Sequence, residues 1–146
     1  MTAHDPGKTP GTTIAKRLLD EARAAARQAY APYSKFRVGA AVLGGDGAIY
    51  KGANIENASF GLGTCAERVA LATAIAGGER NLVAIAIACV DAPENSPLAQ
   101  RMPCGACRQW IQELAPEAEI FILGENRSFR IHDLLPMAFS LEHEKG

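Results

Sequence analysis

The sequence has no long apolar run, no excess of basic charge and few histidines. No stretch reaches the roughly 20 apolar residues of a membrane-spanning helix. The N-terminal MTAHDPGKTPGTT has no apolar signal core. These absences predict a cytoplasmic protein without a membrane anchor. Because the formal net charge is only −1, bulk attraction to phosphate backbones is missing. A nucleic-acid partner is therefore disfavoured, and a small-molecule substrate is favoured.

The histidines and cysteines limit the choice of metal chemistry. The three histidines, His4, His132 and His143, show no ligand spacing, so we assign them no role in a site. The sequence has four cysteines. In a reducing compartment cysteines act as thiols or metal ligands before they form disulfides. Any metal site in this chain is therefore expected to be built from cysteine.

The pattern of apolar residues predicts one α/β domain. With 146 residues, 48% of them hydrophobic, the chain can bury a core and is not expected to be disordered. We expect a mobile tail over 1–12 and a single domain over 13–146, with no internal repeat. Helical and strand patterns alternate, which indicates layers around one central sheet. The expected helices are 13–29, one within 62–76 that begins near Cys65, 104–114 and a turn at 132–135. The expected strands are 37–43, 48–54, 82–90, 119–123 and 128–131.

Three of the four cysteines lie in two short motifs, TCAER at 64–68 and PCGACRQ at 103–109. Both motifs lead directly into helical patterns, so Cys65, Cys104 and Cys107 can occupy the first turns of two helices. Thiolates at this spacing, completed by a third from elsewhere, suit Zn²⁺. Three protein ligands leave the fourth tetrahedral position open, as in catalytic zinc sites. A C-x-x-C pair alone would also fit a redox dithiol or a structural zinc knuckle.

Glu67 and Arg68 follow the first cysteine and suggest chemistry beside the metal. Residues at positions i and i+2 of a helix do not face each other, so Glu67 is poorly placed as a fourth ligand. It is better placed to move protons to and from a water activated by the metal. Three thiolates outweigh the charge of Zn²⁺, and Arg68 is the candidate to offset the excess. Alone, Glu67 would be read as a helix N-terminal carboxylate and Arg68 as a surface residue.

Cys89 is the remaining cysteine and could in principle close the site as a fourth ligand. It lies in the apolar run over 82–90, where a cysteine is usually a small buried hydrophobe. We therefore favour the open site. A redox dithiol is also disfavoured, because it gives no reason for the Cys65-Ala66-Glu67 order.

The chain resembles the small zinc-dependent cytidine deaminase family, of the three-cysteine, homotetrameric type. The resemblance rests on the stretch from Tyr30 to Leu71, on PCGACRQ at 103–109 and on LLPMAF at 134–139. It also matches the known deaminase signature of cysteine ligands with a glutamate that is not a ligand. The resemblance implies a three-layer α/β/α domain with one central mixed sheet. It further implies one zinc ion per chain and Glu67 as the proton shuttle.

The same resemblance implies a nucleoside substrate and assigns the residues that contact it. The reaction would convert cytidine and deoxycytidine to uridine and deoxyuridine with release of ammonia, in pyrimidine salvage. Asn54 and Glu56 would hold the ribose hydroxyls, while Phe36 and Ala66 would lie against the substrate. The family implies a homotetramer with sites at subunit interfaces, where Phe139 reaches a neighbour's substrate. From the pattern alone, Phe36 and Phe139 would be core residues. Asn54 and Glu56 would make the ordinary hydrogen bonds of a turn or strand end.

Three other functions compete with this hypothesis. One is a deaminase of a cytosine-containing antibiotic, of the blasticidin type, on the same fold; the Asn54–Asn57 stretch argues against it. Another is a non-catalytic binding module that zinc only stabilises. Nucleic-acid editing is the third, and the near-neutral charge and the lack of a basic stripe disfavour it.

Overall fold

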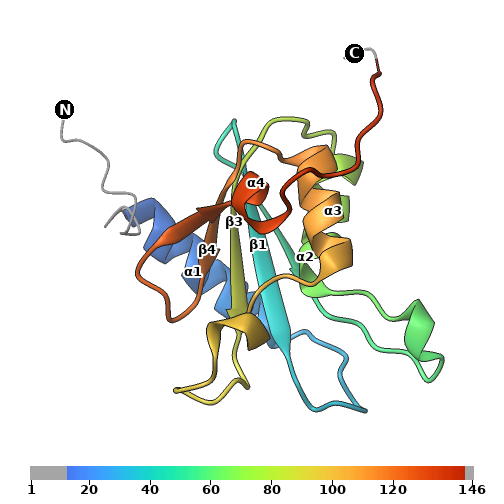
Figure 1. Cartoon of the computed structure of the whole chain (residues 1–146). Helices are drawn as coiled ribbons and strands as arrows, with labels where there is room; N and C mark the ends of the chain where they lie inside the picture. Colours follow the sequence, from blue (N-terminus) through green and yellow to red (C-terminus); the bar gives the residue numbers. More distant parts are fainter. Residues whose placement is uncertain (1–12, 144–146) are drawn as a thin grey trace.

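The structure is a computed structural model that describes residues 13–143 (Figure 1). The expected tail over 1–12 lies outside the described residues. The main helices are α1 (Thr13–Ala26), α2 (Ala66–Ala76), α3 (Gly105–Leu114) and the short α4 (Ile131–Leu134). The strands are β1 (Val38–Gly44), β2 (Ile49–Ala53), β3 (Leu82–Cys89), β4 (Glu119–Ile122) and β5 (Ser128–Arg130), with single 3₁₀ turns η1 (Phe60–Leu62) and η2 (Leu98–Gln100). None of the helices in the described part could cross a lipid bilayer.

One mixed sheet forms the centre of the molecule. The strand order is β2-β1-β3-β4-β5. Only β3 and β4 run parallel, and the other three pairs are antiparallel. Helix α1 covers one face, while α2, α3 and α4 lie on the other (Figure 1). This arrangement confirms the predicted three-layer α/β/α fold with a central mixed sheet.

The central strand β3 is buried on both faces, and alanine and isoleucine alternate along it. Ala84, Ala86 and Ala88 pack in the cluster with α1, whereas Ile85 and Ile87 pack in the cluster with α2 and α3. Successive side chains of a strand point to opposite faces. The small alanines let α1 lie close to the sheet, and the isoleucines fill the wider space beneath α2 and α3.

Two glycines allow the helices to approach the sheet even more closely. A Cβ atom on Gly39 of β1 would lie 1.9 Å from the Ala22 carbonyl oxygen of α1. A Cβ atom on Gly52 of β2 would lie 2.4 Å from the Ala70 backbone nitrogen of α2. No side chain fits at either position. Close contact with β2 thus brings α2, which begins with the Cys-Ala-Glu motif, against the sheet.

Two predictions for the first helix are wrong in detail. The predicted helix over 13–29 ends at Ala26, because the chain turns there and the Tyr30 backbone N–H donates to the Asn54 carbonyl oxygen. Ile14 stands at helical spacing from Leu18 and Ala22 in the sequence, which predicts a place on the apolar face, but its side chain is 57% exposed. The buried face runs through Ala15, Leu18 and Ala22 instead.

Candidate metal centre

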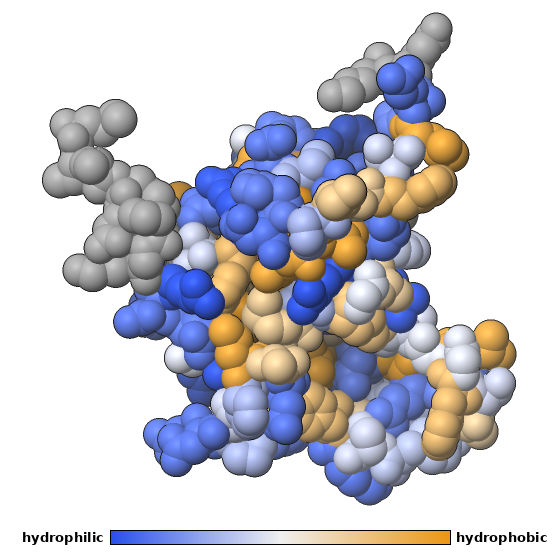
Figure 2. Space-filling view, in the orientation of Figure 1, coloured by the Kyte–Doolittle hydropathy of each residue, from blue (hydrophilic) through white to orange (hydrophobic). Residues whose placement is uncertain are grey.

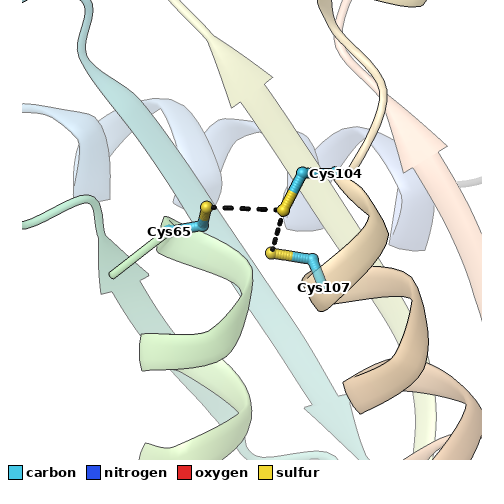
Figure 3. A group of neighbouring side chains, drawn as sticks. All are labelled: Cys65, Cys104 and Cys107. Carbon is cyan, nitrogen blue, oxygen red and sulfur yellow. Dashed lines mark hydrogen bonds between the residues drawn. The ribbon is translucent and has the colours of Figure 1, made fainter. Parts of the chain in front are cut away.

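The three motif cysteines lie at the start of two neighbouring helices (Figure 3). Cys65 is the N-cap residue of α2, and Cys104 is the N-cap residue of α3. Neither side chain makes a capping hydrogen bond, so both sulfurs are available for a metal. Cys107 follows in the first turn of α3. Helix N-termini favour anions, and both helices therefore stabilise thiolates at this point.

The sulfur positions match a tetrahedral metal site. The Cys104 Sγ lies 3.7 Å from the Cys65 Sγ and 3.5 Å from the Cys107 Sγ (Figure 3). A tetrahedral ion with Zn–S bonds of about 2.3 Å holds two sulfurs about 3.8 Å apart. Within residues 13–143 this is the one group of three or more candidate ligands whose atoms lie within 4.8 Å of one another. The residues present therefore fit zinc, with one coordination position left open.

Cys89 does not join this group. Its Sγ lies 3.9 Å from the Arg101 carbonyl oxygen, and its side chain packs against the core. Burial raises the pKa of the Cys89 thiol to about 11, so it stays protonated and is a poor ligand. The alternative of a closed four-cysteine site is thus not supported.

Glu67 lies in the first turn of α2 and is only 5% exposed. Burial raises the pKa of its carboxyl group to about 7, although a hydrogen bond with the Cys107 side chain acts in the opposite direction. A carboxyl group with a pKa near neutrality can both accept and donate a proton at physiological pH. Glu67 is not grouped with the clustered ligand atoms, so a role beside the metal stays a prediction.

Arg68 contacts the thiol cluster directly. Its Nη2 donates to the Cys65 Sγ at 3.6 Å. Hydrogen bonds from Cys107 and from Arg68 lower the pKa of Cys65 to about 5, so this sulfur is a thiolate at neutral pH. The Arg68 Nε is buried and has no hydrogen-bond partner among the described residues. The Arg68 side chain is therefore half-buried against the cysteine cluster.

Glu56 organises the loop that precedes β1. Its Oε1 accepts hydrogen bonds from the backbone N–H groups of Tyr33 at 2.9 Å and Ser34 at 3.1 Å. Its Oε2 accepts from the Ser34 hydroxyl. The Ser34 hydroxyl bond is the main cause that lowers the pKa of Glu56, which is a carboxylate at neutral pH. The contacts to Ser34 were not foreseen, because nothing in the local pattern links residues so far apart.

A cavity of about 390 Å³ opens beside this carboxylate. The cavity is lined by Tyr33, Ser34, Glu56, Asn57, Phe60 and Gly63. Across it the rings of Tyr33 and Phe60 meet edge to face, with centroids 5.9 Å apart. In such a cavity the carboxylate can accept hydrogen bonds from the hydroxyl groups of a ligand. The aromatic side chains can at the same time contact an apolar face of that ligand.

Asn54 lies just beyond the end of β2 and supports the segment that carries Phe36. Its Nδ2 donates to the Phe36 carbonyl oxygen at 2.8 Å, and its Oδ1 accepts from the Val38 N–H at 2.9 Å. One amide hydrogen and one lone pair of this side chain remain for other partners. Asn54 thus has a structural role at the strand end, which the sequence pattern alone also indicates.

The remaining predicted site residues are placed differently from one another. Ala66 is fully buried at the start of α2, next to Cys65. Phe139 is 69% exposed and does not line the cavity beside Glu56. The chain that carries it passes over α3 after α4 (Figure 1). Within one chain the structure therefore brings together the cysteines, Glu67 and Arg68, but it leaves Phe139 apart.

A larger apolar hollow of about 570 Å³ lies between α2 and α3 and is lined partly by Trp110 and Leu114. It contains neither the cysteines nor Glu67. The candidate site is therefore identified by the cluster of sulfur atoms and not by the volume of a hollow.

Comparison with known proteins identifies the family. The family model of the cytidine and deoxycytidylate deaminase zinc-binding region matches residues 12–123. This span includes the three clustered cysteines and Glu67. The chain belongs to this family. Zinc is therefore the metal of the site, and Cys65, Cys104 and Cys107 are its ligands.

Individual members of the family are similar over most of their length. A cytidine deaminase of Halalkalibacterium halodurans is 46% identical over 129 residues, which cover 86% of this chain and 93% of that protein. One from Mycobacterium tuberculosis is 47% identical over 126 residues, covering 86% and 89%. The crystal structure of the Burkholderia pseudomallei cytidine deaminase superposes with a TM-score of 0.76 at 45% identity, covering 85% of this chain and 98% of that one. The M. tuberculosis crystal structure has a TM-score of 0.74 at 41% identity, with coverage of 86% and 97%.

Proposed function

We propose that this protein is a hydrolytic deaminase that converts cytidine and deoxycytidine to uridine and deoxyuridine in pyrimidine salvage. The observation that carries the proposal is the cluster of three thiols with the buried Glu67 carboxyl group beside it. The similar proteins named above are cytidine deaminases. Zinc, when bound, acts as a Lewis acid that activates water for attack on C4 of the base. A cytoplasmic location suits the site, because reducing conditions keep the cysteines available as ligands.

Glu67 would carry the protons of the reaction. Its raised pKa, about 7, lets the carboxylate accept a proton from the attacking water. The same group can pass this proton to the ring nitrogen, accept the second proton of the added water from the hydroxyl group on C4, and give it to the amino group, which leaves as ammonia. Water supplies the carbonyl oxygen on C4 of the uracil, so the overall change is cytidine plus water to uridine plus ammonia. One carboxyl group suffices because each proton that it accepts is passed on within the same cycle.

Arg68 would partly compensate the negative charge of the thiolates. Its guanidinium group donates to the Cys65 sulfur, and it draws electron density away from the metal's ligands. Groups that contact ligands in this way tune the acidity of a metal site. The N-termini of α2 and α3 add partial positive charge at the same place.

Arg68→Gln is expected to keep the fold but lose much of the activity and move the rate profile to higher pH. Without the guanidinium group the thiolates keep their full negative charge, so the reacting water ionises only at higher pH. Adding Cys65→His removes one negative charge and should recover part of the loss. The measurements are pH–rate profiles and zinc content of both variants. Arg17→Gln, on α1 across the sheet, is the control, and an unshifted profile for Arg68→Gln would contradict this role.

The sugar of the substrate would lie in the cavity beside Glu56, and the base would extend from it to the cysteine cluster and Glu67. The carboxylate can accept hydrogen bonds from the sugar hydroxyls, and Asn54 has a free amide hydrogen for the same sugar. Phe36, which the Asn54 side chain holds in place, would lie against the base. Ala66 would contact the substrate through its backbone, since its side chain is buried.

Glu56→Gln should raise the KM for cytidine much more than the KM for cytosine, because only cytidine carries the sugar. The comparison needs a control, since Glu56 also orders the loop through Ser34. Ser34→Ala removes the hydroxyl contact and leaves the carboxylate in place. It should affect both substrates to a similar and smaller extent. If Glu56→Gln weakened both substrates equally, Glu56 would not be in the sugar pocket.

A homotetramer with sites at subunit interfaces would complete the substrate pocket. Two projecting segments expose apolar side chains, the loop around η1 and the C-terminal segment (Figure 2). Phe60 is 79% exposed and Leu62 is 71% exposed, which is typical of surfaces that another chain covers. Phe139 would then reach the substrate of a neighbouring chain. Light scattering of the purified protein tests the assembly.

Zinc content and ammonia release measured on one preparation test the function directly. Stoichiometric zinc with cytidine turnover is the expected result. Zinc without turnover would favour a non-catalytic zinc-stabilised module. A substrate panel that includes cytosine-containing antibiotics separates the nucleoside deaminase from its nearest rival.

A further inference from the structure

Two consecutive side chains of α3 hold both ends of the C-terminal loop, which we define as residues 134–139. The Arg108 Nη1 donates to the Leu134 carbonyl oxygen at 2.6 Å. The Gln109 Nε2 donates to the Phe139 carbonyl oxygen at 2.9 Å. Both acceptors are backbone atoms, so the contacts fix the path of the loop whatever its side chains are.

Arg108 also connects this loop to the metal-binding turn. The Arg108 Nε donates to the Pro103 carbonyl oxygen at 2.8 Å, and Pro103 directly precedes the ligand Cys104. Within the loop Met137 has a φ of +54°, which side chains rarely adopt. The loop is therefore a tight turn that is tied to the first half of the metal-binding helix.

The Phe139 ring remains exposed although its backbone is held. After Phe139 the chain still contacts α3, where the His143 Nε2 lies 3.5 Å from the Glu113 Oε2. The Gln109 hydrogen bond is made to the backbone of Phe139 itself, so it is the α3 contact that acts directly on the residue carrying the ring. A backbone without this bond would regain conformational freedom, and the ring would no longer be presented in one position.

We propose that Gln109 is a positioning residue that presents the Phe139 ring to the substrate. This inference rests on the proposed deaminase function, in which Phe139 contacts a nucleoside. It assigns Gln109 an effect on substrate binding that is exerted only through Phe139. The effect does not depend on which chain of an assembly receives the ring.

The alternative is that Gln109 only stabilises the fold, and the two roles separate experimentally. Because Gln109 donates to a backbone oxygen, Phe139→Ala keeps the hydrogen bond and removes only the ring. Gln109→Met keeps the length of the side chain and removes the donor. In a purely structural role, Gln109→Met would have the same consequence whether or not the ring is present.

The experiment is a double-mutant cycle on the full-length, zinc-loaded protein, with kcat and KM measured for cytidine. Stacking of a base on an aromatic ring contributes about 1–3 kcal/mol, so Phe139→Ala should raise KM about tenfold with little change in kcat. Gln109→Met should raise KM about threefold or more, and only in the presence of Phe139. The double variant should match Phe139→Ala. Gln112→Met on the same helix is the control and should leave KM unchanged.

Thermal unfolding of the same variants completes the test. Gln109→Met should lower Tm equally with and without the Phe139 ring, because the backbone contact is lost in both. KM effects that multiply in the double variant would overturn the proposal, as would an unchanged KM in either single variant. Those results would leave cytidine deamination intact. Absence of cytidine turnover in the wild-type protein would instead overturn the proposed function and this inference together.

Discussion

Glu67→Gln is expected to lower the turnover of cytidine by about a hundred- to ten-thousand-fold while zinc binding persists, since general acid–base catalysis contributes that much. Glutamine has nearly the same shape as glutamate but cannot carry protons between the water, the ring nitrogen and the leaving amine. Because the carboxyl group is buried and is not among the clustered ligand atoms, the substitution should leave the three sulfurs in place. Ammonia release gives the rate, and elemental analysis gives the zinc content.

Glu94→Gln is the matched control for this variant. Glu94 is exposed in the loop after β3, so its substitution should change neither rate nor zinc content. Cytidine binding by the Glu67 variant should also be retained, and isothermal titration would detect it. Turnover within a few-fold of wild type would mean that Glu67 is not the proton shuttle.

Cys104→Ala is expected to abolish both zinc binding and activity. Two thiols remain, and two ligands are too few for the tetrahedral sites of catalytic zinc. Cys104 is the most informative ligand to remove, because its side chain is exposed while that of Cys107 is fully buried. Truncation at Cys107 would also cost core packing, whereas truncation at Cys104 tests the metal alone. Zinc per chain and the rate of ammonia release are the measurements.

Cys89→Ala provides the control among the cysteines. Its sulfur lies outside the cluster, so zinc content and activity should match those of wild type, with at most a modest loss of stability. Replacing Cys65 or Cys107 with alanine should have the same effect on zinc as Cys104→Ala. Full zinc occupancy in Cys104→Ala would contradict the ligand assignment.

The sequence alone predicted the features that depend on local spacing. The positions of Cys65 and Cys104 ahead of helical patterns predicted two helix starts, and the i, i+2 spacing predicted that Glu67 is not a ligand. The apolar run over 82–90 predicted a strand, and the structure has one at Leu82–Cys89. Such features depend on the period of a helix or strand, which one segment of sequence records.

Tertiary structure alone decided the contacts between distant segments. The distance between the sulfurs of Cys65 and Cys104 is set by how α2 and α3 pack on the sheet, and motif spacing could only make it plausible. The hydrogen bond between Ser34 and Glu56 joins residues 22 positions apart, and the one between Gln109 and Phe139 joins residues 30 positions apart. No local pattern records such a pair, because each partner satisfies its hydrogen bonds with whatever the fold brings near. For the same reason Ile14 fits a helical apolar stripe but faces solvent: the angle at which α1 lies on the sheet decides which part of the stripe is covered.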